Sequence, residues 1–204
     1  IFAHLVLADE INRATPKTQS ALLEAMQEHT VTSGTSTHEL EPPFLVMATQ
    51  NPIETEGTYP LPEAQVDRFM MKVLVGYPSE EEEVDIVRRV TGAENKVSAV
   101  ATTEQMAALQ RECRTVYVDT SLVHYAVRLA GATRHPARYG IADLAQYISF
   151  GASPRASINL ITTGRALAFV RGRDYVVPQD IVDLAMDVMR HRLVLSYEAM
   201  SDGI

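Results

Sequence analysis

Leu5-Val6-Leu7-Ala8-Asp9-Glu10 is the stretch from which the fold of this 204-residue chain can be predicted. A short, continuous apolar run is typical of a strand that is buried on both faces, as in a parallel sheet. Unpaired carboxylates are costly to bury, so Asp9 and Glu10 are expected where the strand leaves the sheet. Because ligands bind at the carboxyl ends of strands in open parallel sheets, the two acids mark a candidate binding edge.

The two adjacent acids also suggest a particular chemistry. Side chains alternate along a strand, so Asp9 and Glu10 should point in different directions. One carboxylate could then reach a Mg²⁺ ion and the other a water molecule, which is the arrangement of a Walker B strand in ATP hydrolysis. The alternative is a strand end with two solvated acids, and this stretch alone leaves both interpretations open.

A second apolar run, residues 44–49, is followed by Gln50-Asn51-Pro52. If this run forms a parallel neighbour of the first strand, Asn51 points into the same crevice as Asp9 and Glu10. An amide in that position could orient a water molecule beside a phosphate group. The alternative is a plain Asx turn before the proline.

The remaining sequence predicts more of an α/β part and then helices. Thr15-Pro16 is a typical helix start, and the apolar spacing continues to about Glu28. We expect a hairpin over residues 30–40, a loop over 53–62, a short helix over 63–69 and a third strand over 69–75. After the boundary at residues 77–79 only helices are expected, with starts at Ser79, Thr102, Asp119, Ser153 and Pro178.

The composition argues against several classes of protein. The net charge of −8 disfavours a nucleic-acid partner. The single cysteine, Cys113, excludes an internal disulfide and a cysteine metal cluster. No apolar run approaches the roughly 20 residues of a membrane span, and no signal peptide is visible. We therefore expect a protein of the reducing cytoplasm.

Several short motifs occur in a fixed order and together resemble the AAA+ ATPases. They are Asp9-Glu10, Asn51-Pro52, Asp67-Arg68-Phe69 and Ser153-Pro154-Arg155. The sequence resembles that of the MoxR family in particular over residues 8–14, 48–52, 56–65 and 191–199. The resemblance covers nearly the whole chain. It implies an α/β fold, in which part of a P-loop NTPase core (residues 1–78), a parallel sheet with helices, is followed by an all-α lid (residues 79–204).

The resemblance also implies a role for each site residue, with ATP and Mg²⁺ as cofactors. Asp9 resembles the Walker B aspartate that holds Mg²⁺ through water, and Glu10 the catalytic glutamate that polarises the attacking water. Asn51 resembles sensor 1, which helps to place that water and contacts the nucleotide. Arg68 resembles an arginine finger, and Arg155 resembles sensor 2, which binds the nucleotide from the lid.

The two arginines can also be weighed by their surroundings. Arg155 falls in the first turn of a helix capped by Ser153, where a cation is unfavourable by about 0.3–1 kcal/mol unless an anion binds there. A γ-phosphate would fit, and the alternative is an arginine that bends back to a carboxylate or to solvent. Arg68 could be donated to the nucleotide of a neighbouring subunit, which is worth roughly 10³–10⁵ in rate, or form a surface pair with an aspartate.

One motif of the family is missing from the printed sequence. A P-loop reads Gly-x-x-x-x-Gly-Lys-Ser/Thr, and none of the ten glycines is followed by a lysine. In the family this loop precedes the Walker B strand, and the first residue here is Ile1. We therefore expect a fragment that binds ATP weakly or not at all by itself.

For the intact protein the resemblance implies ATP hydrolysis coupled to remodelling or maturation of client proteins. It also implies a ring-shaped homo-oligomer, expected to be a hexamer, and a von Willebrand factor A domain protein as a possible partner. Two other classes stay open. One is a non-catalytic interaction or oligomerisation module that lost the P-loop in evolution, and the other is a motor like magnesium chelatase or a helicase.

Overall fold

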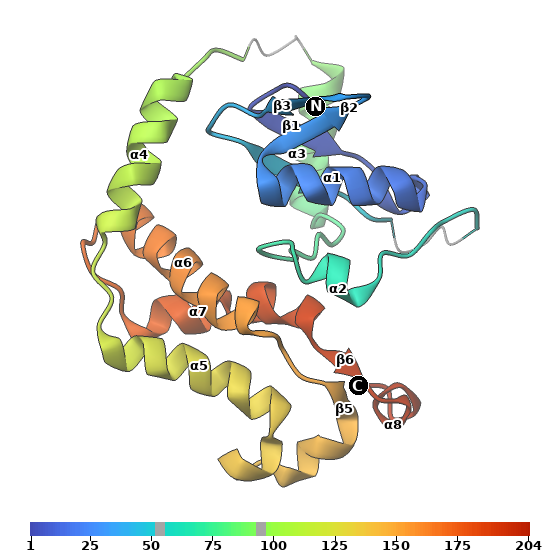
Figure 1. The fold of residues 1–204 in the computed structure, drawn as a ribbon, viewed down its shortest axis with the longest axis vertical. Coiled ribbons are helices and arrows are strands. Elements are labelled where there is room, and N and C mark those ends of the chain that lie inside the picture. Colours follow the sequence, from blue (N-terminus) through green and yellow to red (C-terminus); the bar gives the residue numbers. More distant parts are fainter. Residues whose placement is uncertain (52–55, 93–96) are drawn as a thin grey trace.

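The structure, a computed structural model, describes residues 1–51, 56–92 and 97–204 (Figure 1). The first part of the chain contains β1 (Leu5–Ala8), η1 (Ile11–Arg13), α1 (Pro16–Glu28), β2 (Thr30–Ser33), β3 (Ser36–Glu39), β4 (Leu45–Ala48) and α2 (Glu63–Val66). The second part contains α3 (Glu80–Thr91), α4 (Thr103–Thr115), α5 (Thr120–Arg134), η2 (Pro136–Tyr139), η3 (Ala142–Tyr147), β5 (Ile148–Phe150), α6 (Pro154–Val170), α7 (Pro178–Met189), η4 (Arg190–Arg192), β6 (Val194–Leu195) and α8 (Tyr197–Ser201).

A parallel pair of strands forms the centre of the α/β part. β1 pairs with β4 in the register that places Ala8 opposite Ala48. The chain between them forms α1 and the antiparallel β2–β3 hairpin, both as predicted (Figure 1). α1 begins with Thr15 as N-cap and Pro16 in the first turn. The apolar spacing predicted one buried face of this helix, and the buried residues are Gln19, Leu22, Leu23 and Ala25.

The prediction that the first strand is buried on both faces is wrong. Leu5 and Leu7 are 55% and 61% exposed, and their partners Leu45 and Met47 are 55% and 45% exposed. These four side chains are alternate residues of two paired strands, so they share one face, and among the described residues that face is not covered by another layer. One face of this pair, which we call the outer leucine face, is therefore open to water.

The predicted third strand over residues 69–75 does not form. Its backbone groups bond to the lid instead of to a sheet. The Lys72 N–H donates to the Asp187 carbonyl at 2.8 Å, and the carbonyls of Phe69 and Met70 accept from Arg192. Because these three backbone groups already have partners in the lid, they are not available to pair with a neighbouring strand. The preceding helix is also shorter than predicted, since α2 ends at Val66.

The lid is helical, as predicted, and has its own apolar core. α6 packs against α5 on one side and α7 on the other. Buried side chains of these helices and of the segments that precede α5 and α7 form one cluster, composed of Val116, Leu122, Ala126, Leu160, Ala168, Val176, Ile181 and Val188. The helix starts were predicted correctly, including the capping boxes at Ser79 and Thr102. One short antiparallel pair, β5–β6, and the terminal helix α8 were not foreseen.

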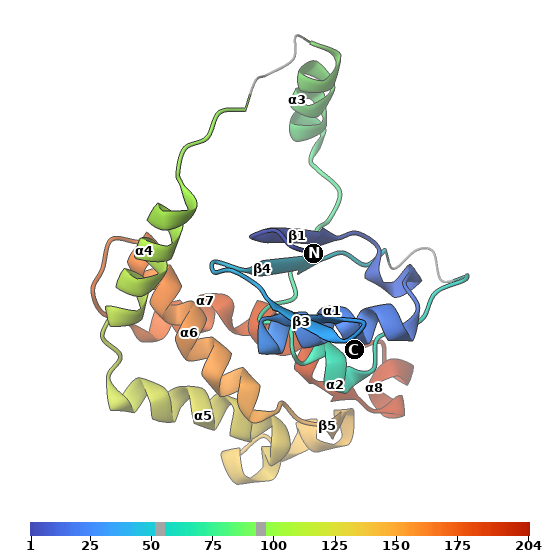
Figure 2. The ribbon, with the colours of Figure 1, turned by 45° about the horizontal axis from the view of Figure 1, so that its top comes forward.

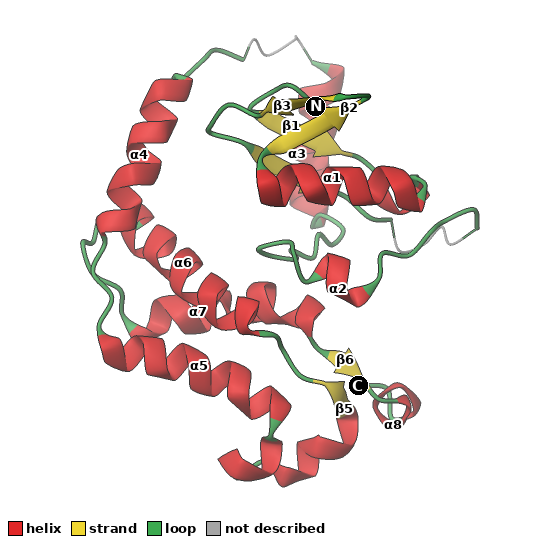
Figure 3. Cartoon of the chain, in the orientation of Figure 1, coloured by secondary structure: helices red, strands yellow, loops and turns green. Residues whose placement is uncertain are grey.

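α3 stands apart from the rest of the molecule in Figure 2. Its capping box and the glycine at its end, Gly92, match the sequence prediction. Its apolar residues Val84, Val87 and Val90 are nevertheless 44%, 55% and 78% exposed. Figure 3 shows that the strands β1–β4 lie together on one side, while the helices α4–α7 build the lid. The loop predicted over 53–62 lies partly outside the described residues, as does Pro52.

Candidate functional site

Asp9 and Thr49 lie side by side at the carboxyl ends of the two parallel strands. The register pairs Ala8 with Ala48, so the next residue of each strand leaves the sheet at the same level. The Thr49 hydroxyl donates to Asp9 Oδ1 at 2.5 Å, and the Glu10 N–H donates to the same hydroxyl at 2.8 Å. Thr49 thus joins both acids to β4. The sequence offered no sign of this role beyond the position of Thr49 before Asn51.

Glu10 begins a sharp turn out of the strand. Its backbone is left-handed, with φ 49° and ψ 51°, a conformation that costs a non-glycine residue roughly 1–2 kcal/mol. The Ile11 N–H donates to the Thr49 carbonyl at 3.0 Å, which secures the turn. The Glu10 carboxylate forms an ion pair with Arg13 at 2.8 Å, and its side chain stays 38% exposed. The carboxylate is therefore held at the strand edge but remains accessible.

Asn51 follows Thr49 by two residues and is partly buried at the same edge. Asp9, Glu10 and Asn51 are thus brought to one end of the parallel pair. Carboxylate, hydroxyl and amide oxygens suit Mg²⁺. Among the described residues no group of three or more His, Cys, Asp or Glu side chains could hold a metal ion. The donor set therefore fits an ion that takes one carboxylate and completes its shell with phosphate and water oxygens, as Mg²⁺ does.

Arg68 lies in a different environment. It is exposed and lines a shallow hollow with Leu23, Glu24 and Glu28 of α1 and Gln65 of α2. Within the described residues its guanidinium has no hydrogen bond or ion pair. The surface pair with the adjacent aspartate, the alternative left open by the sequence, does not form, because the Asp67 carboxylate is engaged by the lid.

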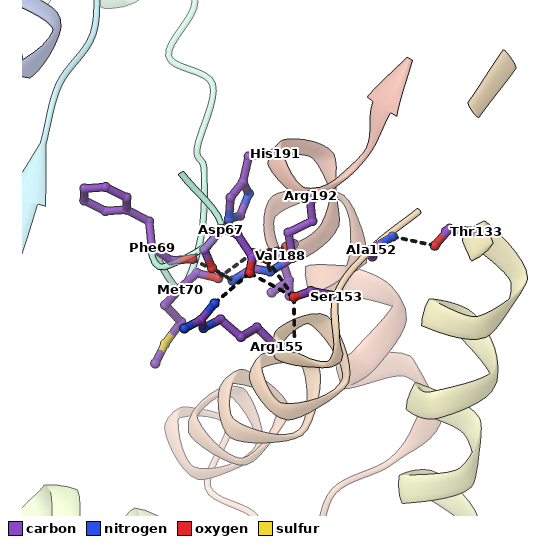
Figure 4. Close-up of polar contacts among 10 residues, drawn as sticks. All are labelled: Asp67, Phe69, Met70, Thr133, Ala152, Ser153, Arg155, Val188, His191 and Arg192. Atoms are coloured by element: carbon purple, nitrogen blue, oxygen red, sulfur yellow. Dashed lines mark hydrogen bonds and ion pairs between the residues drawn. The ribbon is translucent and has the colours of Figure 1, made fainter. Parts of the chain in front are cut away.

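Asp67 connects α2 to the lid through three side chains (Figure 4). The Ser153 hydroxyl lies 2.9 Å from both carboxylate oxygens, and the Arg155 guanidinium donates to Oδ2 at 3.0 Å. Arg192 Nε lies 3.2 Å from Oδ1, an ion pair without hydrogen-bond alignment. Arg155 therefore bends back to a carboxylate here, which is the alternative that the sequence left open for it.

Arg192 is the most deeply buried charge of this group. Its side chain is 0% exposed, and it donates to the carbonyls of Asp67 at 3.1 Å, Phe69 at 2.7 Å and Val188 at 2.5 Å. It also contacts Nε2 of His191. Burial lowers the pKa of the Arg192 guanidinium, which nonetheless stays charged at neutral pH. Burial and then the Arg192 charge lower the pKa of His191 to about 4, so this imidazole is neutral.

We call Asp67, Ser153, Arg155, His191 and Arg192 the Asp67 cluster. All five residues lie within the sequence motifs described above, but the sequence predicted a function only for Arg155. The contacts of Asp67 with Arg192 join residues 125 positions apart, so no local pattern indicates them. A fully buried arginine is rare unless it is paired. The apolar surroundings of Arg192 in residues 188–195 were the one available signal.

Comparisons with known proteins match two family models to separate parts of the chain. A family model described as "ATPase family associated with various cellular activities (AAA)" matches residues 1–71. A second model, described as an AAA lid domain, matches residues 142–204. Together they cover the strand-end acids, the loop with Arg68 and the part of the lid that holds Asp67.

Individual relatives share this similarity over nearly the full chain. Chaperone MoxR1 of Mycobacterium tuberculosis is 52% identical over all of this chain and 54% of its own length. The protein MoxR of Paracoccus denitrificans is 31% identical over 96% of this chain and 62% of its own length. A crystal structure of a proposed ATPase from Cytophaga hutchinsonii has a TM-score of 0.96 and 48% identity, and covers 100% of this chain and 62% of that one. The chain thus spans between half and two thirds of these relatives.

The α/β part and the helical lid that follows it define this chain as part of an AAA+ ATPase. The identities to Chaperone MoxR1 and to MoxR then resolve the class further. The chain belongs to the MoxR family. None of the helices in the described part of the chain is both long and apolar enough to cross a membrane.

Proposed function

We propose that the whole protein hydrolyses ATP at the edge formed by β1 and β4, with Mg²⁺ as cofactor. The observation that supports this most directly is the placement of Asp9, Glu10 and Asn51 at one end of a parallel strand pair. That end is where α/β folds bind ligands. Family membership supports the same reaction, because both matching models describe AAA-type ATPase parts.

Each strand-end residue has a separate task in this proposal. Asp9, oriented by the Thr49 hydroxyl, holds the Mg²⁺ ion through water. The ion supplies positive charge against the phosphates. Glu10 accepts a proton from the attacking water, and Asn51 orients that water by hydrogen bonding. The Glu10 side chain is 38% exposed beside Arg13, so water can reach its carboxylate.

The two candidate arginines act from opposite sides in this proposal. Arg155 leaves Asp67 and binds the nucleotide phosphates from the lid. Arg68 points away from the lid and serves as an arginine finger for the nucleotide of a neighbouring subunit. A finger of this kind requires an assembled ring, which we propose to be a homohexamer.

The work done by the ring is proposed from the family. Chaperone MoxR1, at 52% identity, is named as a chaperone, which supports remodelling or maturation of client proteins. We propose that the ring formed by the present protein works in the cytoplasm and with a von Willebrand factor A domain partner. The polypeptide of residues 1–204 has no Gly-Lys-Ser/Thr loop, so by itself it should bind Mg·ATP too weakly for isothermal titration at micromolar concentrations.

The substitution Glu10→Gln in the whole protein tests the proposal. Removal of a general base should lower turnover by about 10²–10⁴-fold, while Mg·ATP binding persists. The matched control is Glu112→Gln, which changes an exposed glutamate on α4 and should leave turnover unchanged. Phosphate release and nucleotide titration measure the two quantities. If Glu10→Gln turned over ATP as fast as the wild type, Glu10 would not be the general base and the proposed site would be wrong.

A further inference from the structure

Two consecutive residues at the end of α2 face different parts of the molecule. The Asp67 side chain is 13% exposed and bonds to Ser153, Arg155 and Arg192 of the lid. The next side chain, Arg68, is exposed in the hollow beside α1. One short turn therefore carries both the contact to the lid and the arginine proposed to reach the next subunit.

The backbone on both sides of Arg68 is held by one buried guanidinium. Arg192 NH2 donates to the carbonyl of Asp67 at 3.1 Å and to that of Phe69 at 2.7 Å. His191 Nε2 lies 3.1 Å from the Phe69 carbonyl as well. Because these donors belong to η4 of the lid, a rotation of the lid must either carry the Arg68 backbone with it or break these bonds.

The carboxylate of Asp67 fixes the other end of the same connection. Ser153 is the N-cap of α6, so its bond to Asp67 attaches the turn to the start of that helix. A carboxylate at a helix N-terminus is favoured by the helix dipole, and two guanidinium groups neutralise it here. The turn is thus bonded to both α6 and η4, and Arg155 on α6 donates to the same Asp67 carboxylate.

We propose that Asp67 is a positioning residue that couples the orientation of the lid to the presentation of Arg68. This inference rests on the proposed function, in which Arg155 binds a nucleotide from the lid and Arg68 acts on the nucleotide of a neighbouring subunit. When the lid turns about α6 and η4, the anchored turn moves and Arg68 changes its position relative to the neighbouring subunit. Asp67 itself does not touch the nucleotide.

A double-mutant cycle in the whole protein tests this coupling. Asp67→Asn removes the charge but keeps the size of the side chain. In the otherwise unchanged protein it should lower kcat by about tenfold with little change in the KM for ATP, a factor that corresponds to common coupling energies. In the Arg68→Ala background the same substitution should lower kcat by less than about twofold, because the group that Asp67 positions is already absent.

The controls separate this inference from loss of folding and from failure of the proposed function. Glu63→Gln on α2 is exposed and should leave kcat unchanged. Asp67→Glu should recover part of the lost kcat, and circular dichroism should show that each variant is folded. An equal factor for Asp67→Asn in both backgrounds, or no loss at all, would overturn the coupling. Normal turnover in Arg68→Ala would instead remove Arg68 from the proposed function, which Glu10→Gln tests independently.

Discussion

The strand edge and the Asp67 cluster are both rich in charge, but they use it differently. Asp9 is exposed and Glu10 is 38% exposed. The Asp9 carboxylate accepts from the Thr49 hydroxyl, and the Glu10 carboxylate pairs with the partly exposed Arg13 guanidinium. Asp67 and Arg192 are nearly or completely buried and meet partners on α6, η4 and the chain after α2.

This difference indicates which charges serve a ligand and which serve the fold. A buried ion pair is stable only when nearly all of its hydrogen-bonding capacity is used within the protein. Such a pair has little left to offer a nucleotide. An exposed carboxylate with one partner retains acceptor sites for a hydrated metal ion or a water molecule. We therefore expect substitutions in the Asp67 cluster to lower stability most, and substitutions at the strand edge to lower turnover most.

The largest effect on stability is expected from Arg192→Met. The substitution leaves four carbonyls without their Arg192 donor and removes one of the two guanidinium groups that neutralise the Asp67 carboxylate, which should cost about 3–5 kcal/mol of unfolding free energy. Urea unfolding of the whole protein, followed by circular dichroism, measures it. Arg190→Met is the matched control, since Arg190 is 22% exposed and should lose less than about 1 kcal/mol. Similar losses in both variants would contradict the contrast.

A pH dependence of intermediate size is expected from His191. Its pKa is lowered to about 4 in the folded protein, against an ordinary histidine value of 6.5, so the unfolded chain binds a proton first as the pH falls. Stability should therefore be complete above about pH 7 and decrease toward pH 4, by about 2 kcal/mol between pH 7.5 and pH 5.

Unfolding of His191→Gln at the two pH values isolates this contribution. Glutamine does not titrate, so the difference between pH 7.5 and pH 5 should shrink by about 2 kcal/mol relative to the wild type. His124→Gln is the control, because His124 is exposed on α5 and should leave the pH dependence as it is. An unchanged slope in His191→Gln would show that this histidine is not buried in its neutral form.

The smallest stability effect is expected at the strand edge, from Thr49→Val. The loss of two exposed hydrogen bonds, to Asp9 and from Glu10, should cost about 1 kcal/mol, because water replaces them in part. Turnover should fall further than stability, since Asp9 loses its orienting donor. Thr37→Val on the exposed hairpin is the matched control and should change neither quantity appreciably. A stability loss as large as that of Arg192→Met would show that the strand edge is structural.

The features predicted correctly from the sequence are those that depend on neighbours in the chain. The cap at Thr15, the capping boxes at Ser79 and Thr102, and the β2–β3 hairpin each follow from residues within a few positions. The third strand over residues 69–75 was predicted from apolar character alone, and it failed because lid residues more than 100 positions away bind its backbone.

The candidate site shows the same contrast between features that follow from local sequence rules and contacts between distant residues. Asp9, Glu10 and Asn51 could be placed at one edge because parallel strands end on the same side. Thr49 was missed because its hydroxyl acts across two strands, 40 residues apart in the chain. The partner of Arg155 was foreseen only as a class, a carboxylate, and the structure identifies it as Asp67.

The outer leucine face has a practical consequence for laboratory work. Contiguous apolar side chains exposed in this way promote self-association and adsorption to hydrophobic dyes and resins. A sample of residues 1–204 prepared for spectroscopy should therefore give concentration-dependent light scattering. A polar substitution on the solvent-exposed face of β1, such as Leu7→Gln, should reduce this self-association.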